Sequence, residues 1–150
     1  MSLVFPTRDP LRRQAIFCGA LILAALVLVA LGRHAPSHAP IDPALAVQSV
    51  SLRFHDFPDG SIAALDAATG SELARILPGV GGFIRVTMRS FAAERIRKGL
   101  DDREPFLLAR MIDGALRLED PLTGRTMLLN AFGPSNEAVF AELLEKRRLP

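Results

Sequence analysis

Five basic side chains gather near the middle of the chain and are the residues best suited to recognising another molecule. They are Arg85, Arg89, Arg95, Arg97 and Lys98. Only Glu94 opposes them locally, so five positive charges against one negative charge leave this stretch at +4. Guanidinium groups bind carboxylates and phosphates in a bidentate geometry, and clustered basic residues attract anionic lipid headgroups. We therefore predict contact with an acidic partner or with anionic lipid; the alternative is a solvated strand face that protects a sheet edge.

The carboxylates and histidines indicate neither a catalytic site nor a metal site. Asp66 and Asp120 each precede a Thr-Gly pair, and an aspartate in such a turn usually accepts hydrogen bonds from nearby backbone N–H groups. The three histidines, His34, His38 and His55, are not at metal-ligand spacing from cysteines or carboxylates. The sequence contains no G-x-S-x-G, H-E-x-x-H, P-loop or C-x-x-C motif. We expect no catalytic residue, no cofactor, no metal and no small-molecule substrate.

The distribution of charge argues against a nucleic-acid partner. The first 32 residues hold three arginines and one aspartate, whereas the remainder holds 15 basic and 15 acidic residues. The larger part of the chain is therefore neutral, without a basic excess to neutralise phosphates. The single cysteine, Cys18, rules out a disulfide within the chain.

A long apolar stretch at residues 15–32 predicts a transmembrane helix. It contains no charged residue and no proline, and Arg12, Arg13 and Arg33 flank it. Its 18 residues would form a helix about 27 Å long at 1.5 Å per residue, which is enough to cross a bilayer core. Apolar residues occur all round this helix, unlike in a helix that packs one side on a protein core.

Flanking charges predict how this helix would be oriented. Three arginines precede the apolar stretch, whereas Arg33 alone follows it directly. By the positive-inside rule, residues 1–14 are then a cytoplasmic tail, and the chain after the helix lies outside the cytoplasm. A cleaved signal peptide is the alternative, because Ala30-Leu31-Gly32 has small residues where signal peptidase cleaves; the length of the apolar stretch favours an uncleaved anchor.

Small residues within the apolar stretch could let a second helix approach closely. Ala15 and Gly19 are four residues apart, as are Ala20 and Ala24. This spacing places small side chains on one helix face, which favours helix–helix packing. Alanine and glycine are also common in membrane anchors generally, so both interpretations stay open.

The remainder of the chain is predicted to be a linker followed by a β-rich domain at residues 44–150. Residues 33–43 contain three prolines and are expected to be extended. Apolar and polar residues alternate at 50–55 and again at 84–89, which predicts two half-buried strands. Residues 91–98 fit a continuation of the second strand or a short helix, and we expect strand followed by loop.

An internal repeat indicates how the strands are arranged. Asp-Gly at 59–60, Asp66 and Thr-Gly at 69–70 recur 54 residues later as Asp-Gly at 113–114, Asp120 and Thr-Gly at 123–124. Each half reads as strand, turn, strand, turn, strand. We predict two antiparallel meanders of roughly six to eight strands in total, packed on each other as a sandwich or part-open barrel. A helix at about 135–147 would close the domain.

Several short motifs, in this order and spacing, resemble those of a known family. They are Gly82-Phe83-Ile84-Arg85, Pro105-Phe106, Asp113-Gly114, Leu118-Glu119-Asp120-Pro121, Thr123-Gly124-Arg125 and Ala131-Phe132-Gly133-Pro134-Ser135-Asn136. Together with an N-terminal apolar stretch, they resemble the PuhC family of photosynthetic complex assembly proteins of purple bacteria. The resemblance implies a non-enzymatic factor that organises the reaction centre and the light-harvesting 1 antenna, anchored in the inner membrane with its domain in the periplasm.

The resemblance transfers no catalytic residue to this chain. No histidine lies within residues 15–32, so we do not expect direct ligation of bacteriochlorophyll there. Two other functions remain as alternatives: a generic periplasmic binding module or cell-envelope subunit tethered by a signal anchor, and a small membrane-tethered enzyme.

Overall fold

The computed structural model describes residues 10–32 and 40–147, with side-chain exposure for residues 17–29 and 40–147. The chain divides into two compact units, Met1–Ala35 and Pro36–Pro150. Most of the predicted proline-rich linker, residues 33–39, lies outside the described residues, as do residues 1–9 of the predicted tail.

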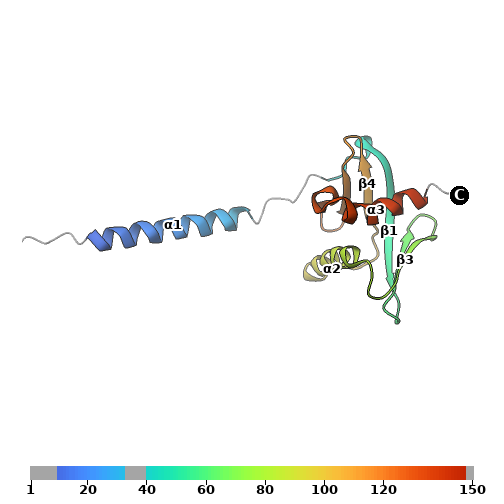
Figure 1. Cartoon of the computed structure of the whole chain (residues 1–150), viewed down its shortest axis with the longest axis horizontal. Helices are drawn as coiled ribbons and strands as arrows, with labels where there is room; N and C mark the ends of the chain where they lie inside the picture. Colours follow the sequence, from blue (N-terminus) through green and yellow to red (C-terminus); the bar gives the residue numbers. More distant parts are fainter. Residues whose placement is uncertain (1–9, 33–39, 148–150) are drawn as a thin grey trace, which may run out of the picture. The chain divides into compact units, whose positions relative to one another are not determined.

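The described part of the first unit is one helix, α1 (Pro10–Gly32), shown in blue in Figure 1. Among the described residues, no helix is both long and apolar enough to cross a membrane. This finding contradicts the predicted transmembrane helix at residues 15–32. It equally contradicts the predicted single-pass location in the inner membrane, with a cytoplasmic N-terminus and a periplasmic domain. The prediction counts the apolar stretch alone as the helix. In the structure α1 begins at Pro10, so its first turns contain Arg12 and Arg13.

The second unit contains one antiparallel sheet whose strand order is β3-β2-β1-β4-β5-β6. The strands are β1 (Ala46–Asp56), β2 (Ile62–Asp66), β3 (Glu72–Ile76), β4 (Phe106–Met111), β5 (Leu116–Asp120) and β6 (Arg125–Leu128). The helices of this unit are α2 (Gly82–Arg97) and α3 (Pro134–Arg147), with short 3-10 helices η1 (Pro43–Leu45) and η2 (Leu129–Phe132).

The main core lies on one face of this sheet. Because side chains alternate along a strand, Leu52 of β1 shares a face with Leu108 of β4 and Leu118 of β5. All three are fully buried, together with Phe91 from α2 and Phe140 from α3. The contacts place α3 against β1 and β4, which it crosses in Figure 1. Helices, and not a second sheet, therefore cover this face.

The opposite face is covered in part by the chain that precedes β1. Ile41 packs there against Ala109 and Met111 of β4. Its backbone N–H donates a hydrogen bond of 2.6 Å to Oε2 of Glu119 on β5. The start of the second unit is thereby fixed across the centre of the sheet.

The predicted sandwich or barrel of two facing meanders is wrong. The two meanders exist, but β1 pairs with β4, so that they join edge to edge in one sheet. Each meander has its apolar side chains on one face, and that pattern fits cover by helices as well as cover by a second sheet. The sequence pattern alone did not distinguish the two arrangements.

The predicted strand at residues 84–89 is also wrong, because these residues lie in α2. The buried residues of α2 are Ile84, Thr87, Met88, Phe91 and Arg95, which follow the three- and four-residue spacing of a helix face. Val86, which the alternation assigned to the core, is 66% exposed. Six alternating residues were too short a window to separate the two periods.

The internal repeat is present in three dimensions as well as in the sequence. β2 and β5 match residue for residue at the offset of 54. Asp66 accepts a hydrogen bond from the N–H of Ala68, just as Asp120 does from the N–H of Leu122. Leu52 and Phe106, themselves 54 residues apart, pair directly across β1 and β4. The two halves are therefore related by an approximate two-fold axis at this central pair.

Candidate functional site

Arg95 of α2 is buried and tied to the opposite half of the sheet. Its Nε lies 2.9 Å from Oδ2 of Asp120 and its Nη2 lies 2.7 Å from Oδ1, a bidentate pair. Nη1 donates to the carbonyl oxygen of Glu104 at 2.9 Å, and the guanidinium carbon lies 4.0 Å from the centre of the Phe106 ring. The two side chains of the pair are only 4% and 0% exposed.

This environment sets the ionisation of Asp120. Burial raises the pKa of its carboxyl, but the hydrogen bonds and the positive charge of Arg95 lower the pKa by more. The net pKa lies below the ordinary value of 3.8, so Asp120 is ionised at neutral pH. The three guanidinium nitrogens of Arg95 all donate hydrogen bonds to groups within the protein. This arginine therefore fastens α2 to β5.

Arg147 of α3 makes the equivalent contact in the other half. Its Nε lies 3.4 Å from Oδ2 of Asp66, and it donates a hydrogen bond to the carbonyl oxygen of Ser49. The Arg147 side chain is 43% exposed, so this pair is more solvated than its counterpart. Thus α2 of the first half is fastened to the Asp120 turn of the second half, and α3 of the second half is fastened to the Asp66 turn of the first half.

Arg85 holds the segment that leads into α2. Its guanidinium donates to the carbonyl oxygens of Ile76 at 3.0 Å, Leu77 at 2.7 Å and Val80 at 2.9 Å. These bonds use the donors of Arg85 within its own neighbourhood. Like Arg95, it is committed to the fold.

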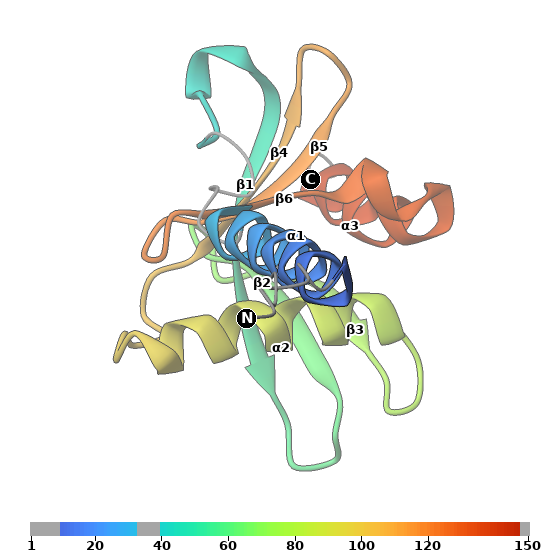
Figure 2. The same cartoon turned by 90° about the vertical axis from the view of Figure 1, so that its left-hand side faces the viewer.

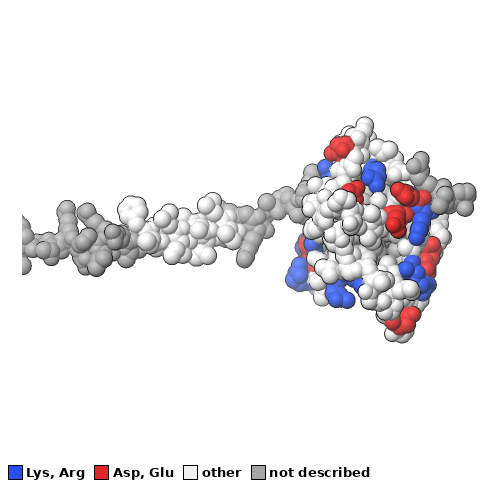
Figure 3. All heavy atoms as spheres, in the orientation of Figure 1, with Lys and Arg blue, Asp and Glu red and all other residues white. Residues whose placement is uncertain are grey.

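The remaining predicted basic residues face solvent. Lys98 pairs with Glu94 at 3.2 Å and donates to the carbonyl oxygen of Thr123 at 3.1 Å. Arg89 and Arg97 are exposed and have no hydrogen-bond or ion-pair partner among the described residues. Figure 3 shows basic side chains over α2 on the visible face of the second unit. Four of the five basic residues lie in α2 and Lys98 directly follows it, so they do not share one strand face, and they divide into fastened and exposed groups.

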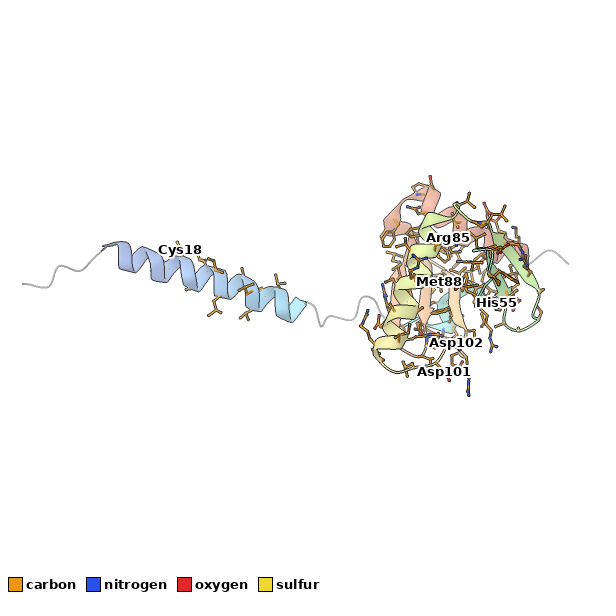
Figure 4. The ribbon with its side chains drawn as sticks, turned by 90° about the horizontal axis from the view of Figure 1, so that it is seen from below. Cys18, His55, Arg85, Met88, Asp101 and Asp102 are labelled. Atoms are coloured by element: carbon orange, nitrogen blue, oxygen red, sulfur yellow. The ribbon has the colours of Figure 1, made fainter. Side chains whose placement is uncertain are left out.

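A groove runs beside α2, and it is lined by residues of α2, including Arg89, and by residues of the sheet. Its volume is about 540 Å³. Apolar side chains that line it are Phe54, Ile62, Met88 and Phe106, and Arg53 of β1 lines it together with Arg89. Figure 4 shows Arg85 and Met88 on α2, with His55 on the neighbouring strand.

The groove also has acidic lining residues. Asp56 belongs to β1, while Asp102 and Glu104 belong to the loop before β4. In Figure 4 the labelled Asp101 and Asp102 lie by the C-terminal end of α2, away from Arg85. Sequence reasoning missed the groove residues of β1, although the alternation at 50–55 had placed Arg53 and Phe54 on a strand.

The predicted packing residues of α1, namely Ala15, Gly19, Ala20 and Ala24, all lie within that helix. A Cβ atom added at Gly19 would meet no described atom within 4 Å. Their role in helix–helix packing stays a prediction. No group of three or more His, Cys, Asp or Glu residues in the described ranges is arranged to hold a metal ion.

The fold and the groove define a class of protein: a small helix-covered sheet domain that offers a surface for recognition. The particular family follows from comparison with known proteins. Residues 47–147 match the family model described as "Photosynthetic complex reorganisation protein PuhC". The chain belongs to this family, which confirms the resemblance carried by the short motifs.

One curated relative comes from Rhodobacter capsulatus and is described as an uncharacterized 17.4 kDa protein in the puhA 5' region. It is 33% identical over 67 residues, which cover 45% of this chain and 41% of the relative. The chain thus matches less than half of that relative's length. No solved structure matches the chain.

Proposed function

We propose that this chain is a non-enzymatic factor that acts on the reaction-centre and light-harvesting 1 polypeptides by direct contact of its folded second unit. Membership of the family gives it a role in photosynthetic complex reorganisation. The observation that carries the finer proposal is the extent of the match. The match begins at the second residue of β1 and ends at the last residue of α3. The part of the chain that the family model matches therefore coincides with the sheet and the helices that cover it.

The exposed arginines of α2 support a role in protein contact. Arg89 and Arg97 have no partner among the described residues, and both stand on a helix that is fastened rigidly through Arg95. Exposed arginines on a rigid element form bidentate contacts with carboxylates without first breaking internal bonds. We therefore assign contact with acidic partner surfaces to this side of the folded unit.

The proposal is tested in a purple bacterium whose gene for this protein is deleted. We expect the deletion strain to accumulate less core complex, or core complex of altered organisation, as measured by near-infrared absorption of isolated membranes. Expression of the wild-type chain should restore the absorption. Unchanged absorption in the deletion strain contradicts the proposal.

A second measurement tests direct contact. A tagged chain is isolated under mild conditions and its companions are identified by mass spectrometry. Recovery of reaction-centre and light-harvesting 1 polypeptides is expected. Recovery of cell-envelope machinery without them contradicts the proposal and favours the alternative of a generic envelope subunit.

A further inference from the structure

The two halves of the sheet differ at one equivalent segment. Residues 77–81 and 129–133 precede α2 and α3 at the same position, 52 residues apart, and both begin with leucine. Leu129 is 0% exposed and belongs to the core, whereas Leu77 is 58% exposed. Leu77 does not leave this position empty, because Ile76, which pairs with Ile62 in the strand register, is buried in the core as Leu129 is.

Polar contacts explain this difference. In the second half, Oδ1 of Asn130 accepts a hydrogen bond of 2.6 Å from the N–H of Leu116, which fixes η2 on β5. In the first half the residue equivalent to Asn130 is Pro78, whose side chain has no hydrogen-bonding group. Arg85 instead holds the carbonyl groups of residues 76, 77 and 80 in a turn outside the core.

A second difference opens the apolar floor of the first half, because the buried Leu144 of α3 is equivalent to the exposed Ala92 of α2. Leu108 and Leu116 of the second half are 0% exposed. Their equivalents at the offset of 54 are Phe54 and Ile62, which are only partly buried and line the groove. Figure 2 shows the β1–β2 hairpin extending beyond α2. The first half thus contains an apolar site that the second half fills with an aliphatic side chain.

The groove also runs along an unpaired strand edge. β1 continues to Asp56, but its pairing with β4 stops at Leu52, which faces Phe106. Residue 105, which would pair next, is proline and has no N–H to donate. The edge of residues 53–56 therefore has no β4 partner in the described sheet. An extended segment of another chain can bind to such an edge by strand addition.

Charge at the groove favours an acidic segment. Five arginines line it against three carboxylates, and Arg95 is already neutralised by Asp120. Arg53 and Arg89 are exposed and lack a partner among the described residues. In an extended segment, alternate side chains point to opposite sides, so one set can reach the apolar floor while the other reaches these arginines.

We propose that this groove binds an extended segment of a partner polypeptide in which aliphatic and acidic side chains alternate. An aliphatic side chain rests on Phe54, Ile62 and Met88 beside Ala92, where the other half has Leu144. Carboxylates pair with Arg53 and Arg89. The identity of the partner as a photosynthetic polypeptide rests on the proposed function. The alternation of aliphatic and acidic side chains in the bound segment is inferred from the groove alone.

The test uses the full chain in a neutral detergent that covers the apolar side chains of α1. A short fluorescein-labelled peptide of alternating leucine and glutamate is titrated with protein, and binding is followed by fluorescence anisotropy. We expect saturable binding that Arg89→Glu weakens by about fivefold or more. The control, Lys146→Glu, makes the same change of charge on α3, outside the groove, and should change affinity by less than about twofold.

A second variant tests the apolar floor separately from charge. Ala92 lines the groove and is equivalent to the buried Leu144, so Ala92→Trp should fill the groove and abolish binding. Because Ala92 is exposed, this variant should keep the circular dichroism spectrum of the wild type. A peptide of alternating leucine and lysine should bind at least about fivefold more weakly than its acidic counterpart.

Several outcomes would overturn the assignment. They are no binding of the acidic peptide, equal binding of the lysine peptide, or equal effects of Arg89→Glu and Lys146→Glu. A marked gain in affinity with Leu77→Ser would show that Leu77 of the same chain fills the groove. Self-association lost with Ala92→Trp would show that a second copy fills it. The peptide assay contains no photosynthetic component, so its result is independent of the deletion experiment.

Discussion

At the scale of single residues, two arginines at equivalent positions of the fold each form an ion pair with an aspartate, but the two pairs differ in exposure to solvent. Arg95 and Arg147 each bind an aspartate that ends a strand of the opposite half. The Arg95 pair is inaccessible to water, whereas the Arg147 side chain is 43% exposed. Removing one partner from a fully buried pair leaves an uncompensated charge, whereas the Arg147 pair, whose Asp66 is 3% exposed, is solvated on the arginine side alone.

We expect Arg95→Ala to lower the free energy of unfolding by about 3 kcal/mol, because it leaves Asp120 buried without its partner. Arg147→Ala, the matched change, should lower it by less, because Arg147 is 43% exposed although Asp66 is only 3% exposed. Urea unfolding followed by circular dichroism at pH 7 measures both. Equal losses would contradict this account of the two pairs.

The pH dependence of stability tests the same pair independently. The pKa of Asp120 is lower in the folded protein than its ordinary value of 3.8. Its ionised form therefore stabilises the fold fully above about pH 4, and this contribution is lost as pH falls through the folded pKa. The stability gap between wild type and Asp120→Asn should shrink from pH 5 toward pH 2.5 in urea unfolding. The exposed Glu145→Gln serves as a control for overall charge, and a gap that is constant with pH would be inconsistent with the pair.

At the scale of elements, the turn into α2 determines where Leu77 lies. Gly81 stands before the first residue of α2 at φ +66°, a left-handed conformation that favours glycine. A Cβ atom there would lie 2.5 Å from Cγ2 of Ile76, a buried branched side chain. This turn and the bonds of Arg85 together keep Leu77 out of the core.

Two glycines of this turn allow a matched comparison. Gly79 also has positive φ, at +79°, but a Cβ atom there would meet nothing within 4 Å. Both alanine variants pay for the left-handed conformation, and only Gly81→Ala adds the clash with Ile76. We expect Gly81→Ala to be less stable than Gly79→Ala by at least about 1 kcal/mol, measured by thermal unfolding. Similar losses would show that Ile76 moves aside freely.

At the scale of the whole molecule, the two halves of the second unit depend on each other. β1 and β4 pair at the centre, and each helix is fastened to the aspartate of the opposite half. Neither half can therefore complete its core or its ion pair alone.

This dependence predicts that residues 36–98 by themselves do not fold. The fragment contains Arg95 and Asp66 but neither of their partners, and it loses the pairing of β1 with β4. Residues 36–150 should fold, because they form one compact unit. Amide chemical-shift dispersion in two-dimensional NMR spectra distinguishes the two. A well-dispersed spectrum from the shorter fragment would contradict the interdependence of the halves.

The membrane-spanning prediction shows a limit of reading one stretch by composition. The composition of residues 15–32 predicts a complete spanning helix, but α1 begins at Pro10, and no described helix meets the length and apolarity of a membrane span. Likewise, alternation at 84–89 predicted a strand where the burial of Ile84, Met88 and Phe91 shows a helix. The hydrophobic pattern of a short segment does not determine which other segments it will pack against in the folded protein.

The sequence by itself determined the parts of this protein that depend on near neighbours. The Asp-Gly and Thr-Gly turns, the strands they join, the 54-residue repeat and the family resemblance all follow from short-range patterns. The tertiary structure alone decided that the halves join edge to edge, which arginines are fastened and which stay exposed, and that a groove is open beside Ala92 where the other half has Leu144. These outcomes depend on contacts between residues 25 or more positions apart, such as Arg95 with Asp120. Such contacts form only when the strands and helices have packed, so no local pattern contains them.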